Sequence, residues 1–143
     1  MLARVASELY WMSRYLERAE SMARILEVCS SIALLSSKGE SQDDLAVSEP
    51  LVITDTEDAF RASGRALRMD QVAQFLAWDE KHPSSISNCI QACRENARSV
   101  RGAITAEMWE CINDTWLQIQ QRRNHMLNDE RALDSAFFEW VKE

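Results

Sequence analysis

Apolar residues recur along the first part of the chain at alternating intervals of three and four. From Leu2 to Leu26 the spacings are 3, 4, 3, 4, 3, 4 and 3 residues. This is the a/d pattern of a heptad repeat, which forms one apolar stripe on a helix and does not fit the two-residue period of a strand. No Gly or Pro interrupts the segment before Gly39. The pattern predicts a helix over about Leu2–Leu35 with this inward stripe: Leu2, Val5, Leu9, Met12, Leu16, Ala19, Ala23 and Leu26.

A second heptad stripe follows the boundary Lys81-His82-Pro83-Ser84-Ser85. Pro fits the start of a helix but not its interior, and either serine can cap the helix that follows. The inward residues of this helix are predicted to be Ile86, Ile90, Cys93, Ala97, Val100 and Ile104. Thr105 can cap the next helix, which is expected to run to about Arg122. Its apolar face consists of Trp109, Ile112, Trp116 and Ile119.

The remaining segments are shorter and less regular. Helices are predicted over Asp55–Leu67, over Asp70–Trp78, and after a cap at Asn128 or Asp129, the last one holding Leu133, Phe137, Trp140 and Val141. The polar stretch Ser36–Ser48 is predicted to be a loop, and the run 50–53 is too short to assign. With only three Gly and two Pro in 143 residues, few tight turns can form. The sequence therefore predicts an all-α protein: an antiparallel multi-helix bundle with one long N-terminal helix, in a single domain over residues 1–143.

The charge and the apolar pattern argue against nucleic acid and a membrane as partners. The formal net charge of −7 disfavours general binding to nucleic acid, because the phosphate backbone is also negative. No segment is apolar for long enough to span a membrane, and the start of the chain lacks the uninterrupted apolar core of a signal peptide. These features, with four cysteines at or near apolar helical positions, predict a cytoplasmic protein with reduced core thiols: Cys29, Cys89, Cys93 and Cys111.

The sequence gives no support for a metal site or a cofactor. A ferritin-like centre needs Glu-x-x-His on bundle helices, and no glutamate lies three positions before His82 or His125. Cys89 and Cys93 could share a metal ion, but a zinc site needs further ligands nearby. No Gly-rich phosphate loop, GxSxG or HExxH motif occurs. We expect neither a metal nor a cofactor.

Polar residues share one narrow sector of the first predicted helix: Tyr10, Arg14, Glu17, Ser21 and Arg24. Arg14 and Glu17 are three residues apart, and Glu20 and Arg24 are four apart, so both pairs can form ion pairs on a helix surface. One interpretation is a solvated face with weak ion pairs. The other is a polar ladder buried between helices or lining a cleft.

The helix after Pro83 has a similar arginine-rich face. Arg94, Arg98 and Arg101 lie together with Gln91, and Glu95 and Asn96 lie beside them. Three arginines on one face repel one another unless carboxylates or an anionic ligand neutralise them. Three interpretations remain open at this point: ion pairs on a solvated face, pairing with Glu17 and Glu20 across two helices, and binding of a carboxylate or a phosphate.

Several segments in order along the chain resemble the alpha-E domain family. They are residues 9–12, 14–20, 75–76, 79, 83–86, 94–98, 100–101, 107–110 and 138–143. The segment 14–20 contains Glu17-Arg18, which resembles the Glu-Arg motif for which the family is named. His82 departs from the family pattern, which usually has Asn before Pro-Ser-Ser. Family members are also typically much longer, so the chain resembles their N-terminal half.

The resemblance implies a bacterial helical module of uncharacterised biochemistry. Genes of the family lie beside, or are fused to, genes for circularly permuted ATP-grasp and transglutaminase-like proteins. This association implies a partner, scaffold or peptide-handling role in a system that forms or processes peptide bonds. An ATP-grasp-type protein or a peptide is therefore the implied partner, and a homo-oligomer is a further expectation if aromatic residues are exposed.

The sequence thus supports a leading hypothesis of a non-catalytic interaction module. The alternatives are a helical enzyme or ligase subunit that binds a carboxylate or phosphate through its Glu/Arg cluster, and a cluster that only supports the bundle. The candidate residues are Arg14, Glu17, Arg18, Glu20, Arg94, Glu95, Asn96, Arg98 and Arg101, flanked by Tyr10, Glu107 and Trp109.

Overall fold

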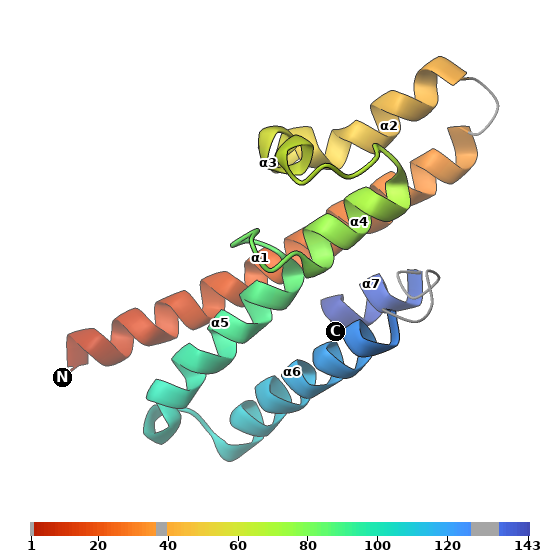
Figure 1. Cartoon of the computed structure of the whole chain (residues 1–143). Helices are drawn as coiled ribbons and strands as arrows, with labels where there is room; N and C mark the ends of the chain where they lie inside the picture. The colour runs from red at the N-terminus through yellow and green to blue at the C-terminus, as the bar shows by residue number, and fades with distance from the viewer. Residues whose placement is uncertain (1, 37–39, 127–134) are drawn as a thin grey trace.

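A single long helix, α1, forms the spine of the protein. The computed structural model describes residues 2–36, 40–126 and 135–143, and α1 spans Leu2–Ser36. At 1.5 Å per residue, these 35 residues extend for about 50 Å. Figure 1 shows several of the later helices lying along α1. The described residues are otherwise helical or irregular and contain no strand, which confirms the predicted all-α bundle.

The heptad stripe of α1 is buried only where other helices cover it. Met12, Ala19, Ala23 and Leu26 are buried, and the two alanines let neighbouring helices approach closely. Leu2, in contrast, is 88% exposed, and Leu16 is also exposed. The stripe therefore predicted the helix and most of its inward face correctly, but the first turns of α1 extend beyond the core.

Two helices follow one another along α1 and run antiparallel to it (Figure 1). They are α4, Met69–Trp78, and α5, Ile86–Ser99. Ser85 caps α5 as predicted, because its side chain accepts a hydrogen bond from the backbone N–H of Asn88 at 3.3 Å. The inward stripe of α5 is buried from Ile86 to Val100, although the α-helix ends at Ser99 and a 3-10 turn, Arg101–Ala103, follows it.

The helix α6, Ala106–Met126, runs back alongside α5. Thr105 caps it as predicted: its hydroxyl accepts a hydrogen bond from the backbone N–H of Met108 at 3.2 Å. Of the predicted apolar face, Ile112 and Ile119 are buried, while Trp109 and Trp116 are half-buried. The predicted helices that correspond to α1, α4, α5 and α6 are thus confirmed, with α4 beginning one residue earlier than expected.

Two predictions for the middle of the chain were wrong. The predicted loop Ser36–Ser48 and the unassigned run after it contain a helix, α2, over Glu40–Ile53. Pro50 lies inside it, where its missing N–H should weaken the helix. Ala46, Pro50 and Leu51 are nevertheless buried, so packing against the rest of the bundle outweighs the local penalty. Residues 37–39 lie outside the described part.

The predicted helix Asp55–Leu67 is much shorter in the structure. Only α3, Glu57–Ala62, is helical, and Ser63 caps its C-terminus. Gly64 then adopts a φ of +71°, a left-handed conformation that ends helices readily because glycine has no Cβ. Phe60 is the buried anchor of this element.

A short final helix, α7, Ser135–Lys142, closes the core. Phe137 and Phe138 are almost completely buried, and the Phe137 ring lies 5.2 Å from the Trp78 ring of α4. Lys142 donates a hydrogen bond to Glu27 at 2.7 Å, which ties α7 to the second half of α1. The predicted cap at Asn128 or Asp129 and the position of Leu133 lie outside the described residues.

Candidate functional site

The polar sector of α1 forms a solvent-exposed row of ion pairs. Arg14 binds Glu17 at 2.8 Å, and Arg24 binds Glu20 through its Nε at 3.1 Å. The Glu17 side chain is 63% exposed, and Arg14 and Arg24 are also exposed. Ion pairs of this kind contribute only tenths of a kcal/mol. On α1, the interpretation as a solvated face is the one the structure supports.

Aromatic rings continue this surface toward the N-terminus of α1. Tyr10 is 58% exposed and Trp11 is 45% exposed, and their rings meet edge to face at 5.4 Å. Trp11 also lies 6.0 Å from the half-buried ring of Tyr15, over which the Arg18 guanidinium is placed at 5.9 Å. An aromatic cluster and a row of charges thus share one side of α1.

The arginine-rich group of α5 has a structural role, because its side chains hold α6. Arg94 donates a hydrogen bond to the side-chain oxygen of Asn113 in α6 at 2.9 Å. The guanidinium groups of Arg94 and Arg101 lie over the Trp109 ring, 5.7 Å and 5.1 Å from its centroid. Stacking on an aromatic ring suits the planar arginine side chain.

Glu95 neutralises part of the charge of the arginine-rich face. Its carboxylate pairs with Arg94 and with Arg98, each at 3.1 Å. Asn96 bonds locally instead, donating to the backbone oxygen of Ala92 at 2.9 Å. The three arginines are thus held by one shared carboxylate and by stacking on Trp109.

Among the described residues, no ion pair joins the α1 glutamates to the α5 arginines. Glu17 and Glu20 bind arginines of their own helix, and the described contacts of Arg94 and Arg101 are with their own helix and with α6. The reason is geometric: α1 packs on the apolar side of α5, whereas the arginines lie on the side that meets α6. Of the interpretations left open by the sequence, pairing across the two helices is therefore not the one that the described contacts support.

Glu107 belongs to the start of α6 rather than to a binding site. Hydrogen bonds to its own backbone N–H and to the Thr105 side chain hold the pKa of its carboxyl below the usual value of 4.5. An acidic residue in the first turn also interacts favourably with the helix dipole. The predicted flanking residues Glu107 and Trp109 are thus both accounted for by the α5–α6 packing.

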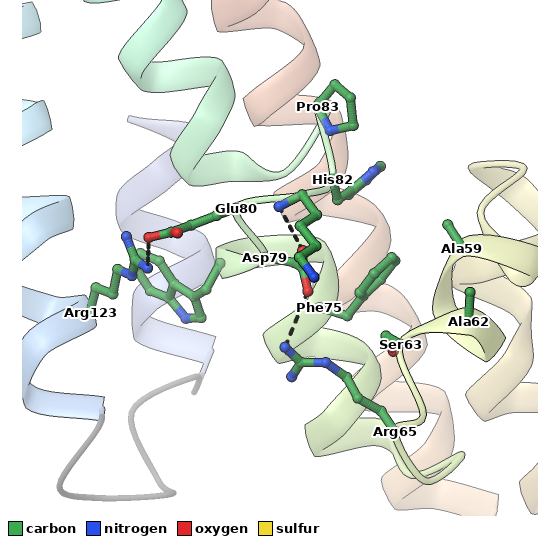
Figure 2. Close-up of a pocket in the computed structure, with 12 residues that line it drawn as sticks. Ala59, Ala62, Ser63, Arg65, Phe75, Asp79, Glu80, His82, Pro83 and Arg123 are labelled. Atoms are coloured by element: carbon green, nitrogen blue, oxygen red, sulfur yellow. Dashed lines mark hydrogen bonds and ion pairs between the residues drawn. The ribbon is translucent and has the colours of Figure 1, made fainter.

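A cleft that the sequence did not predict lies beside the α4–α5 loop (Figure 2). Its volume is about 700 Å³, and its walls come from α3, the end of α4, the loop and α6. Arg65 reaches into it and pairs with Asp79 at 3.2 Å, and Arg123 of α6 forms an ion pair with Glu80. The lining segments are distant in sequence, so no single motif could have revealed the cleft.

His82 is buried at the edge of this cleft. It is only 7% exposed, and its ring stacks on Phe75 with centroids 5.2 Å apart and an angle of 10° between the planes. Burial lowers the pKa of His82 below its usual 6.5, partly opposed by the negative charge of Asp79. The imidazole is therefore uncharged at neutral pH, and its buried Nε2 has no hydrogen-bond partner within residues 2–36, 40–126 and 135–143.

Comparison with known sequences identifies the family. The whole chain, residues 1–143, matches Alpha-E, described as a predicted alpha-helical domain with a conserved ER motif. The chain belongs to the Alpha-E family. Glu-Arg occurs in this Alpha-E domain at Glu17-Arg18, on the exposed side of α1, and again at residues 130–131, outside the described part.

Relatives of this Alpha-E domain occur in mycobacteria. An uncharacterised protein of Mycobacterium bovis is 30% identical over 142 residues, covering 92% of this chain and 14% of the relative. An uncharacterised protein of Mycobacterium tuberculosis is 29% identical over the same length, with the same coverage of each chain. The chain therefore spans only 14% of the length of these relatives. No solved structure is significantly similar to it.

The described part of this Alpha-E domain holds neither a cluster of metal ligands nor a membrane-spanning helix. No group of three or more His, Cys, Asp or Glu residues in the described part is arranged to hold a metal ion. Within residues 2–36, 40–126 and 135–143, no helix combines the length and the apolar character needed to cross a bilayer.

The four cysteines of the Alpha-E domain are free thiols, but they are not all in the core as predicted. Cys29, Cys89 and Cys93 are buried, whereas Cys111 is exposed on α6. Cys111 lies next to the inward position Ile112, on the outer side of the helix, and a one-residue shift on a helix turns a side chain by about 100°. The prediction was therefore wrong for this one residue.

Thiol reactivity should separate Cys111 from the other three. Burial raises the pKa of Cys89 to about 11 and that of Cys93 to about 12, and it also raises the pKa of Cys29. Only the thiolate reacts, so these three thiols should be protected in the folded protein at pH 8. We expect a chromogenic disulfide reagent to label one thiol rapidly in the native state and all four after unfolding. In Cys111→Ser the rapid phase should disappear, and its persistence would contradict the described burial.

Proposed function

We propose that this Alpha-E domain is a non-catalytic interaction module, whose partner is an ATP-grasp-type protein or a peptide of a system that forms or processes peptide bonds. The observation that carries this proposal is the exposed side of α1, where Tyr10 and Trp11 lie beside the ion pairs of Arg14 and Glu17. We call the surface formed by these four residues the α1 face.

The α1 face has the composition of a protein interface. Tyrosine, tryptophan and arginine are enriched where proteins bind one another, and they dominate the binding energy. The two aromatic rings contact each other, so they are partly fixed before any partner arrives. The charged groups of Arg14 and Glu17 are likewise paired and pre-positioned. A surface that is already ordered loses less entropy on binding.

The nature of the partner rests on two supports. The family resemblance associates alpha-E domains with ATP-grasp and transglutaminase-like proteins. In addition, the relatives are far longer than this chain, so in those proteins a region of this kind accompanies a large amount of other sequence. A small helical module with an ordered exposed face fits a docking role beside larger partners.

Two substitutions separate binding from folding. Glu17→Gln removes an exposed charge, so the free energy of unfolding should change by less than about 0.5 kcal/mol while the affinity for the neighbouring ATP-grasp protein falls. Arg94→Gln removes the bond to Asn113 and the stacking on Trp109, so it should cost about 1–3 kcal/mol of stability with little effect on affinity. Urea denaturation and biolayer interferometry measure the two quantities.

The same pair of variants distinguishes the alternative functions. If wild type and Glu17→Gln bind the ATP-grasp protein equally, and Arg94→Gln changes only the stability, the polar groups of α1 and α5 merely support the bundle. A helical enzyme or ligase subunit would instead show product formation when the ATP-grasp protein, ATP and candidate amine and carboxylate substrates are combined, with turnover lost in Glu17→Gln but binding retained. Loss of binding in Glu17→Gln without loss of stability would support the interaction module.

A further inference from the structure

We propose that a small pocket between α1, the turn after α2 and the α4–α5 loop binds a carboxylate group, held by Arg18 with Ser21, Ser84 and His82. This site lies beyond the proposed docking function and does not depend on it. The pocket has a volume of about 220 Å³ and is lined by Arg18, Ser21, Met22, Ile25, Thr54, His82 and Ser84. Since liquid water occupies about 30 Å³ per molecule, it can hold a ligand of small size, such as one acylated amino acid.

Arg18 differs from the arginines around it. Arg14 and Arg24, on the same helix, each pair with a glutamate of their own helix, as does Arg94 on α5. Arg18 is half-buried, and within the described part of the chain its guanidinium lies over the Tyr15 ring and pairs with no carboxylate. A guanidinium presents two parallel donors that match a carboxylate or phosphate. Its charge is thus available at the pocket wall.

His82 provides an independent indication of a ligand. The residue is more than nine-tenths buried, yet its Nε2 has no hydrogen-bond partner among the described residues. A buried polar atom left in this way is destabilising unless something binds it. Figure 2 shows the His82 ring turned away from the Glu80–Arg123 ion pair, and His82 also lines the pocket that holds Arg18. The orphaned nitrogen and the unpaired arginine therefore meet at one cavity.

The position of His82 is fixed by the fold, as a binding group requires. Phe75 stacks on its ring, and the side-chain amide of Asn88 donates a hydrogen bond to its backbone oxygen at 2.8 Å. A group held in place by packing and by a neighbouring hydrogen bond loses little freedom when a ligand binds. The pocket is thus preorganised on its loop side.

Two hydroxyl groups complete the polar lining. Within the described residues, neither Ser21 nor Ser84 donates a hydrogen bond that the structure records, so both can donate to a ligand. Thr54 cannot serve in the same way, because its hydroxyl bonds the backbone oxygen of Pro50 at 2.7 Å. Met22 and Ile25 supply an apolar wall that suits a short aliphatic group.

The charge balance favours a carboxylate over a phosphate. The lining contains one cation, Arg18, and no Asp or Glu, while His82 is neutral at neutral pH. One positive charge matches one carboxylate, whereas a phosphate carries about −1.5 to −2 at pH 7. The carboxylate could belong to a free amino-acid derivative or to the C-terminus of a peptide, and these two sources share the same recognition chemistry.

Titration of the 143-residue chain by proton–nitrogen NMR tests the site. The probes are N-acetyl-L-alanine, its uncharged amide, a pentapeptide ending in Ala with a free or an amidated C-terminus, and inorganic phosphate. We expect N-acetyl-L-alanine to shift the signals of His82 and of residues around Arg18, and the amide to have no effect. If N-acetyl-L-alanine and the pentapeptide with a free C-terminus both bind, the site accepts peptide C-termini as well as small acids. If only N-acetyl-L-alanine binds, the site is restricted to small molecules.

Substitutions assign the binding to Arg18. Arg18→Gln should lower the affinity for N-acetyl-L-alanine by at least about tenfold, since a charge-assisted hydrogen bond contributes about 1.5 kcal/mol or more. Arg18→Lys keeps the charge but not the planar fork, so it should bind with intermediate affinity. The control is Arg24→Gln, which replaces an exposed arginine six residues further along α1. This variant should bind N-acetyl-L-alanine like wild type. Circular dichroism confirms that each variant is folded.

Four results would each overturn the proposal. They are no shift at millimolar N-acetyl-L-alanine, equal binding of the acid and its amide, tighter binding of phosphate than of the acid, and equal loss in Arg18→Gln and Arg24→Gln. The last result would mean that the acid only follows the general charge of α1. A tenfold loss confined to the Arg18 variants would support the site.

Discussion

Replacing Phe137 by alanine is expected to lower the free energy of unfolding by about 3–5 kcal/mol, the range found when a buried aromatic ring is removed from a core. Phe137 is fully buried and contacts the rings of Trp78, Phe138 and Trp140 at 5.2, 5.6 and 6.1 Å. The cavity left by the ring would separate α7 from α4. Because α7 covers the core late in the chain, we expect a cooperative loss rather than local fraying.

Urea denaturation followed by circular dichroism measures this loss. A matched control is Leu117→Ala on α6, where the side chain is 49% exposed and most of its surface already meets water. The control should cost less than about 1 kcal/mol, as is usual for exposed positions. If Phe137→Ala were as mild as the control, the packing of α7 against α4 described above would be incorrect.

The second large effect is expected at Asn88, which organises the α4–α5 loop. Its side-chain amide donates to the backbone oxygens of Asp79, Glu80 and His82 at 3.3, 3.0 and 2.8 Å. Asn88→Ala would leave these carbonyl groups without that donor, at a cost of about 1–3 kcal/mol. The signals of His82 should also broaden or move in NMR spectra, since the loop would lose its anchor.

Two further variants separate the amide donor from the side-chain volume. Asn88→Asp has nearly the same shape, but its carboxylate only accepts hydrogen bonds and would repel the carbonyl oxygens. It should therefore be at least as destabilising as Asn88→Ala. Asn96→Ala on the same helix removes only a local bond to Ala92 and should cost less. If Asn88→Asp were neutral, the loop would not depend on the amide donor.

Helices with strict periodicity could be predicted from the sequence, and those shaped by tertiary contacts could not. The stripes of α1 and α5 are regular because each helix buries one side along most of its length. The α2 helix has no such stripe and contains Pro50, which locally indicates a boundary. It is helical because Leu51 and its neighbours reach the core, and no local pattern encodes that contact.

The candidate site shows the same division. The ion pairs within α1 could be predicted from residue spacing, but the partners of the α5 arginines could not, because angular position on one helix does not say which helix lies opposite. Arg94 contacts Asn113, 19 positions later, and no spacing rule predicts such a pair. The Arg18 pocket was missed for a related reason: His82 and Ser84 come from a loop whose position depends on Asn88 and Phe75.

The length and continuity of α1 have a thermodynamic consequence. Glu17 lies on the exposed α1 face, and Arg18, the next residue, lines the pocket beside the α4–α5 loop. An occupant of either site that shifts or rigidifies this turn of α1 therefore acts on the other site. Linkage then requires reciprocity: if a carboxylate in the pocket changes the affinity for a partner by some factor, the partner changes the affinity for the carboxylate by the same factor. Binding in the Arg18 pocket and binding at the α1 face would thus be coupled through a single turn of α1.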